Sequence, residues 1–195
     1  TGVMPDVSFA TGAGIEVARG VLVDRRLRTS APSVFAAGDC AELRDPPAGR
    51  AAIEALWYVA REQGGVAGRN MAGAEVEYAP GVFYNSAKFF DIEWQQYGRI
   101  DPAGVEDYET VYWQDPRGRR ALRIQHARGD GAVVGVSAVG IRLRQEACSR
   151  WITEAQPVGR AIERLREALF DEELGGKLWR DVQTGMAAGG WQRAA

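Results

Sequence analysis

The chain has 195 residues, of which 46% are hydrophobic and 26% are charged, and its formal net charge is -2. Such a composition is typical of a globular protein with one or two domains, and the low net charge offers little attraction for phosphate backbones or anionic lipids. No stretch reaches the roughly 20 consecutive apolar residues that span a bilayer, so we expect neither nucleic acid nor a membrane as a partner.

The N-terminal part of the chain predicts short extended segments joined by irregular chain. Residues 1–14 are rich in glycine, proline and small side chains, which predicts an irregular crossing segment. In residues 15–23, apolar and polar residues alternate on either side of Arg19-Gly20, which predicts a β-hairpin. Residues 34–37 then predict a short buried strand that ends directly before Gly38-Asp39-Cys40.

A helix is predicted after this strand. In residues 51–73 the apolar side chains fall near helical spacing, and Gly64-Gly65 predicts a break or a kink. The composition changes around residues 77–81, where proline and glycine follow a tyrosine. We therefore expect two domains, residues 1–76 and residues 77–195.

The second domain predicts a sheet followed by helices. Residues 82–98, 108–114, 119–127 and 132–140 are rich in aromatic and β-branched side chains, and turn-like sequences separate several of them. They predict an antiparallel meander of four or five strands. Residues 142–155 and 158–174 carry apolar side chains three and four apart among charges, which predicts amphipathic helices on the sheet. The expected fold class is α+β.

The Gly38-Asp39 pair has two interpretations. A glycine at the end of a strand lets the backbone approach a ligand closely, and the following carboxylate then accepts hydrogen bonds from ligand hydroxyl groups. Ligands of open α/β sheets bind at this carboxyl edge. The alternative is that Asp39 satisfies N–H groups of a local turn, where aspartate is common.

Three ordered motifs together resemble one family. They are TG-x-x-P at residues 1–5, RG-x-x-VD at residues 19–24 and LRTS-x-P-x-VFAAGDCAE at residues 27–42. This combination resembles the FAD-dependent pyridine nucleotide-disulfide oxidoreductase superfamily, which includes rubredoxin and putidaredoxin reductases, nitrite reductase flavin subunits and apoptosis-inducing factor. The resemblance covers roughly the first 75 residues.

The resemblance implies a cofactor site. It implies that Asp39 hydrogen-bonds a ribitol hydroxyl of FAD and that Gly38 leaves room for this contact. It also implies that the N-terminal end of the following helix, which carries Glu54, Ala55, Leu56 and Trp57, faces the flavin pyrimidine ring. For Trp57, packing in the core is the alternative to a flavin or nicotinamide contact.

FAD and NAD(P) domains each need a glycine-rich turn that seats the pyrophosphate on a helix N-terminus, and the chain contains no GxGxxG. The resemblance therefore implies that residues 1–76 are the closing segment of an incomplete FAD-binding Rossmann-like domain. Residues 77–195 then correspond to the C-terminal interface domain, which often forms a homodimer. We expect the chain to be the C-terminal part of a longer enzyme, in which the binding of FAD and NAD(P)H needs regions outside this sequence.

The aromatic residues of the first predicted strands fit two roles. In the first role they pack in the core of a sheet. In the second they form an interface with another chain or a wall over the flavin. These residues are Phe83, Tyr84, Phe89, Phe90, Trp94 and Tyr97.

No catalytic residue and no metal ligand is predicted. The single histidine, His126, does not lie in the His-Glu motif of disulfide reductases and is interpreted as structural or surface-exposed. Cys40 and Cys148 lack a CxxC or metal-ligand spacing, so both are interpreted as small buried residues with free thiols, which are typical of the cytoplasm.

Two functions remain. The first is part of an FAD-dependent NAD(P)H oxidoreductase, in which a hydride passes from nicotinamide to flavin and electrons leave to an unidentified protein or small molecule. The second is a non-enzymatic dimerisation or interaction module. The intact Asp39 motif favours the enzyme.

Overall fold

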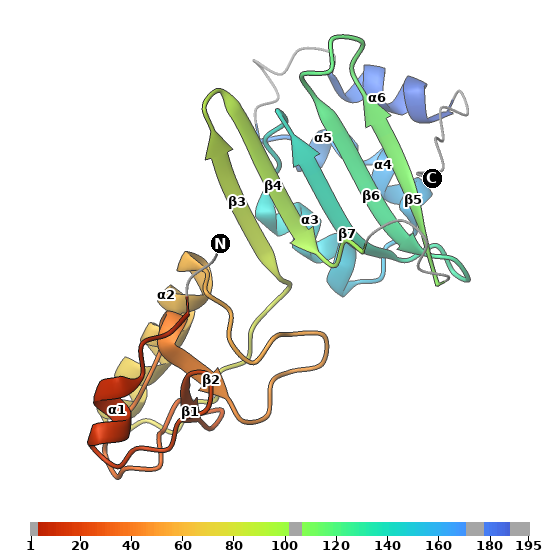
Figure 1. The fold of residues 1–195 in the computed structure, drawn as a ribbon. Coiled ribbons are helices and arrows are strands. Elements are labelled where there is room, and N and C mark those ends of the chain that lie inside the picture. Colours follow the sequence, from red (N-terminus) through yellow and green to blue (C-terminus); the bar gives the residue numbers. More distant parts are fainter. Residues whose placement is uncertain (1–3, 102–106, 171–177, 188–195) are drawn as a thin grey trace. The chain divides into compact units, whose positions relative to one another are not determined.

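The computed structural model describes residues 4–101, 107–170 and 178–187. The chain divides into two compact units, Thr1–Gly81 and Val82–Ala195, which are described separately below (Figure 1). The first unit contains helices and a pair of short parallel strands, and the second contains helices and a five-stranded sheet. The predicted α+β class is confirmed. None of the helices within the described residues is long and apolar enough to cross a membrane.

Helix α2, Trp57–Met71, organises the first unit (Figure 1). Strands β1, Val21–Val23, and β2, Ala41–Leu43, pair in parallel, and the 3-10 helix η1, Gly38–Cys40, leads directly into β2. Helix α1, Ser8–Gly12, precedes them. The core consists of the buried side chains Val23, Leu27, Ala41, Leu43, Val59, Val66, Ala67 and Tyr78.

Several predictions for this unit are wrong. Residues 34–37 form no strand, and only Phe35 makes a bridge, to Arg28. The reason is that β1 pairs with β2, which follows η1. Residues 34–37, which precede η1, therefore do not pair with β1. The predicted hairpin is reduced to a single bridge between Val17 and Val21, and the segment predicted to be irregular contains α1.

Gly64-Gly65 does not break α2, because the helix continues through both residues. A glycine inside a helix costs about 1 kcal/mol relative to alanine. Both glycines lie on the exposed side of α2, whereas Val59, Val66 and Ala67 are buried. Packing of that face maintains the helix across the glycines.

The second unit is a five-stranded antiparallel sheet in the order β3-β4-β7-β6-β5 (Figure 1). Its strands are β3, Tyr84–Phe89; β4, Ile92–Gly98; β5, Tyr108–Gln114; β6, Ala121–Ala127; and β7, Val133–Val139. The strands lie within the predicted segments, but a simple meander is wrong. Strand β7 is inserted between β4 and β6, since it continues the hairpin from β6 and also pairs with β4.

The helices lie over one face of this sheet (Figure 1). They are α3, Gln145–Thr153; α4, Val158–Glu163; α5, Leu165–Ala168; and α6, Leu178–Ala187. The amphipathic pattern of residues 142–155 is confirmed as α3. The pattern of residues 158–174 forms two short helices that meet at Arg164, and residues 171–174 lie outside the described residues.

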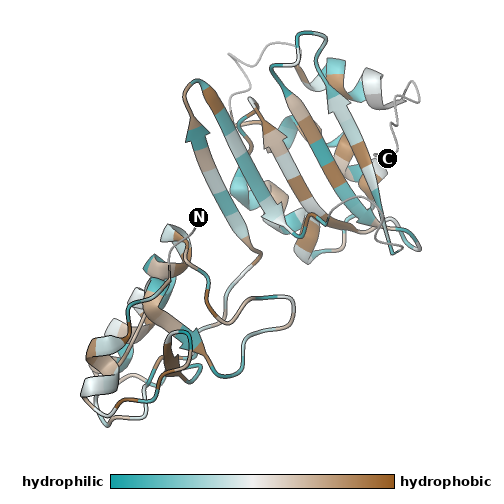
Figure 2. Ribbon diagram, viewed as in Figure 1, coloured by the Kyte–Doolittle hydropathy of each residue, from teal (hydrophilic) through white to brown (hydrophobic). Residues whose placement is uncertain are grey.

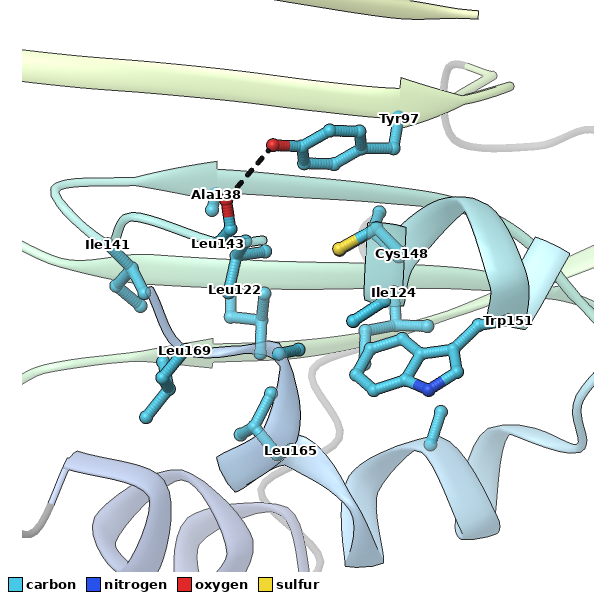
Figure 3. Packing of buried hydrophobic residues seen from close by; sticks show 14 of the residues in the cluster. Tyr97, Leu122, Ile124, Ala138, Ile141, Leu143, Cys148, Trp151, Leu165 and Leu169 are labelled. Carbon is cyan, nitrogen blue, oxygen red and sulfur yellow. Dashed lines mark hydrogen bonds between the residues drawn. The ribbon is translucent and has the colours of Figure 1, made fainter. Parts of the chain in front are cut away.

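The core of this unit forms where the helices meet the sheet. Figure 3 shows Cys148 and Trp151 of α3 beside Ile124 of β6, and all three side chains are at most 1% exposed. The hydroxyl of Tyr97 donates a hydrogen bond of 3.2 Å to the Leu143 carbonyl oxygen, which ties β4 to the chain that enters α3 (Figure 3). Alternating strand residues thus supply the apolar face that α3 covers.

The aromatic residues of β3 and β4 divide between core and surface. Tyr97 is buried and stacks on Tyr84 with ring centroids 5.9 Å apart, as the core interpretation predicts. The core interpretation is wrong for Phe89 and Phe90, which are 62% and 98% exposed at the tip of the β3–β4 hairpin. Figure 2 shows apolar residues at this tip.

Gly135 of β7 allows close contact between backbone segments. A Cβ atom at this position would lie 1.7 Å from the Arg99 carbonyl oxygen. We expect Gly135→Ala to lower the free energy of unfolding by about 3 kcal/mol, since the backbone must move to relieve the overlap. Denaturant unfolding measures the change, with Gly129→Ala as the control because a Cβ atom there meets nothing within 4 Å. Equal stability of the two variants would contradict this packing.

Candidate functional site

Asp39 lies in the middle of η1, and its side chain is exposed. No side chain in the described part of the chain caps this 3-10 helix. Among the described residues, the Asp39 carboxylate has no hydrogen-bond or ion-pair partner. The turn-capping interpretation of Asp39 is therefore wrong, and its carboxylate is available to accept hydrogen bonds from a ligand.

Gly38 holds η1 close to helix α2. Its backbone has a φ of 79°, in the left-handed region that favours glycine. Its N–H donates a hydrogen bond of 2.8 Å to Oε1 of Gln63, and a Cβ atom on Gly38 would lie 3.2 Å from the Cβ atom of Ala60. The absence of a side chain on Gly38 thus lets η1 approach α2 closely.

Helix α2 begins without a side-chain cap from any described residue. Leu56 precedes it with an extended backbone, and its first turn contains no acidic residue. The amide of Ala60 donates a hydrogen bond of 2.9 Å to the carbonyl oxygen of Leu56, the residue that precedes the helix. An uncapped N-terminus of a 15-residue helix favours a negative charge nearby.

Glu54 is committed to an ion pair within this unit. Its carboxylate accepts two hydrogen bonds from Arg50, of 2.8 Å at Nε and 2.7 Å at Nη2. The two side chains are only 12% and 10% exposed, and Arg50 Nη1 also donates to the Gly81 carbonyl oxygen at 3.1 Å. The pair fixes the chain that enters α2, and Glu54, Ala55 and Leu56 precede the helix rather than belong to it.

Trp57 is the first residue of α2, and 68% of it is exposed. The core-packing alternative for Trp57 is therefore wrong. The Tyr58 ring lies edge-on to the indole with centroids 5.2 Å apart, and the Arg61 guanidinium carbon lies 5.9 Å from the centroid of the indole ring. These contacts leave a large aromatic surface exposed beside the uncapped helix end.

The site contains residues that the sequence did not single out. Gln63 is 3% exposed, and Tyr78 is 4% exposed. Burial raises the pKa of the Tyr78 hydroxyl. The helical period of residues 51–73 places Gln63 on the same face as Val59 and Val66, which is the signal that would have predicted a buried glutamine.

His126 and Cys148 lie in the second unit. His126 is buried within β6, and its Nδ1 lies 3.1 Å from the Ala127 carbonyl oxygen, in agreement with the structural interpretation. Cys148 is buried in α3, and burial raises the pKa of its thiol. Cys40 is partly exposed in η1, with Sγ 3.6 Å from the Ala37 carbonyl oxygen. Thr1 and Gly2 of the first motif lie outside the described residues.

Residues 1–64 match the model of the family described as pyridine nucleotide-disulphide oxidoreductase. The chain is 34% identical over 157 residues to an NADH oxidase of Methanocaldococcus jannaschii, with 72% of this chain and 34% of the relative covered. It is 33% identical over 140 residues to the ferredoxin–NAD(+) reductase component of the anthranilate 1,2-dioxygenase system of Burkholderia cepacia, with 72% of this chain and 33% of the relative covered.

A solved structure is similar to the chain as well. The NAD-dependent persulfide reductase of A. fulgidus matches with a TM-score of 0.66 and 25% identity, over 84% of this chain and 33% of that one. The chain thus spans about a third of the length of these relatives.

The two thiols should differ in reactivity. We expect Ellman's reagent to modify Cys40 rapidly in the native protein and Cys148 only after unfolding, because a buried thiol with a raised pKa forms little thiolate. Absorbance of the released thiolate measures both phases, and Cys40→Ser serves as the control that removes the rapid phase. Rapid modification in the Cys40→Ser variant would contradict the burial of Cys148.

Proposed function

Because the chain belongs to the pyridine nucleotide-disulphide oxidoreductase superfamily, we propose that it supplies the ribitol-binding and pyrimidine-facing part of an FAD-dependent NAD(P)H oxidoreductase. Residues 1–76 are the closing segment of the FAD-binding domain in this proposal, and residues 77–195 are the interface domain. The division of the structure into units at Gly81 and Val82 supports two domains close to this boundary.

The observation that carries the proposal is the exposed carboxylate of Asp39, which follows Gly38 and has no partner among the described residues. A carboxylate accepts hydrogen bonds only, which suits the hydroxyl groups of a ribitol chain. The residues present therefore fit the flavin. When bound, the flavin supplies the chemistry of accepting a hydride and passing electrons on.

The other proposed site residues act on the flavin ring. The uncapped N-terminus of α2 stabilises negative charge near the pyrimidine ring, since the helix dipole is positive at this end. Exposed Trp57 shields the ring from water. Glu54, Ala55 and Leu56 form the approach to this helix end, and the pairing of Glu54 with Arg50 holds their backbone in place.

The acceptor is a protein or a small molecule. Among the relatives, the Burkholderia cepacia protein is named as a ferredoxin reductase component, which supports an electron-carrier protein. The free thiols Cys40 and Cys148 support a location in the cytoplasm, where thiols stay reduced. A non-enzymatic module is the competing proposal. It gives no role to the Asp39 carboxylate, which has no partner among the described residues, so this carboxylate favours the oxidoreductase.

A colour test decides between the two. We expect the intact oxidoreductase that contains this chain to purify yellow with bound flavin and to bleach anaerobically when NADH or NADPH is added. Asp39→Asn should weaken flavin binding roughly tenfold, because a hydrogen bond to a charged group contributes more than one to its neutral counterpart. Flavin fluorescence titration of the apoprotein measures the affinity.

Asp45→Asn is the matched control, because Asp45 is exposed and pairs only with Arg25 among the described residues. A colourless intact protein that takes up no flavin on reconstitution would rule out the oxidoreductase and favour the non-enzymatic module. Unchanged flavin affinity in Asp39→Asn would rule out Asp39 as a ligand.

We also propose that the second unit forms a homodimer through the tip of the β3–β4 hairpin. Phe89, Phe90 and Ile92 are more than half exposed there, and such apolar side chains bury well in an interface. Phe90 also holds a φ of 53°, which is costly for a bulky residue. A strained, exposed phenylalanine supports a binding role.

The homodimer has its own test. We expect Phe90→Asn to weaken dimerisation roughly tenfold, because it removes an apolar anchor, while asparagine tolerates the left-handed backbone and preserves the turn. Sedimentation equilibrium measures the dissociation constant. Phe9→Asn is the control, since Phe9 is 68% exposed in the first unit. A monomeric wild-type protein, or an equal effect of both variants, would disprove the proposed contact.

A further inference from the structure

Gln63 is a buried polar residue to which the proposed ligand contacts give no role. Only 3% of it is exposed, and burying a side-chain amide is unfavourable unless the amide is hydrogen-bonded. Its Oε1 atom accepts a hydrogen bond of 2.8 Å from the N–H of Gly38, a residue 25 positions away in sequence. Gln63 therefore makes a buried hydrogen bond with the backbone of the residue that precedes Asp39.

This hydrogen bond acts together with a steric contact from the same helix. Ala60 lies one turn before Gln63 on α2, and a Cβ atom on Gly38 would lie 3.2 Å from its Cβ atom. Helix α2 therefore contacts Gly38 in two ways, through a directional hydrogen bond and through close packing. The first contact sets the orientation of the Gly38 amide, and the second sets its distance from the helix.

Gly38 has a backbone that needs such a constraint. Glycine adopts positive and negative φ about equally well, so the φ of 79° is not enforced by the residue itself. A change at Gly38 would swing the next residue, and the Asp39 carboxylate has no partner of its own among the described residues to hold it. The direction of Asp39 thus depends on the backbone at Gly38.

We infer that Gln63 is a positioning residue that holds Gly38, through its amide, in the conformation that presents the Asp39 carboxylate to a ligand. The inference rests on the proposed function, because it takes the ligand to be the ribitol of FAD. Helix α2 then organises both parts of the site, since its N-terminus faces the flavin ring and Gln63, within the helix, orients Asp39. The relative placement of the two groups depends on one rigid element.

The first test follows the Gly38 amide directly. Gln63→Met removes the Oε1 acceptor and keeps a side chain of similar volume. We therefore expect hydrogen exchange of the Gly38 amide to accelerate roughly tenfold, as measured by NMR in the 195-residue chain. Gln95→Met is the matched control. Gln95 is also a buried glutamine, and its Oε1 accepts a backbone hydrogen bond of 2.7 Å, from Leu143 in the second unit. It should leave Gly38 exchange unchanged.

The second test is a double-mutant cycle for flavin affinity in the apoprotein of the intact oxidoreductase. Gln63→Met should weaken FAD binding roughly tenfold in the wild-type background and hardly at all in the Asp39→Asn background, because Gln63 acts through Asp39. Gln95→Met should leave the affinity unchanged in both backgrounds. A general loss of stability would lower affinity equally in both, so the cycle separates positioning from folding.

The outcomes distinguish the two proposals. Equal losses in both backgrounds, or unchanged exchange of the Gly38 amide, would overturn the role of Gln63 and leave Asp39 as a ligand. An Asp39→Asn variant with wild-type FAD affinity would overturn the proposed ligand contact instead. In that case the exchange rate of Gly38 still decides whether Gln63 holds η1.

Discussion

The close approach of η1 to helix α2 is the constraint on which the first unit depends. It requires a glycine at position 38, because the backbone there lies against Ala60 and adopts a left-handed conformation. The Gln63 hydrogen bond compensates the buried Gly38 amide, which would otherwise be unsatisfied. With η1 fixed in this way, the chain continues directly into β2, which pairs in parallel with β1. One packing contact therefore determines where Asp39 emerges.

The second unit is organised by a different constraint. Its sheet is covered by helices on one face, and Trp151 and Ile124 lie in the core between them (Figure 3). Gly135 lets β7 lie against the chain at Arg99, so that β7 occupies the place between β4 and β6. The tip of the β3–β4 hairpin is excluded from this core and presents its apolar side chains at the surface. The core and the proposed contact surface are thus separate parts of one sheet.

Periodicity predicted much of the second unit and less of the first. Strands β4 to β7 and helix α3 carry alternating or helical patterns, because each buries side chains in the core between the sheet and the helices. Residues 34–37 show an apolar run as well, but their pairing depends on where β1 finds its partner, and that partner is β2. The same limit applies to the exposed side chain of Trp57, since aromatic character alone does not distinguish a core residue from a surface residue.

The sequence by itself determined the family motifs, the α+β class and the position of Asp39 within GDC, because these depend on residue order and local spacing. Only the tertiary structure decided that the Asp39 carboxylate has no partner among the described residues, that Glu54 pairs with Arg50, and that Gln63 accepts a hydrogen bond from Gly38. The physical reason is that each of these depends on which side chain lies next to a given carboxylate or amide. The packing of elements that are distant in sequence determines those neighbours.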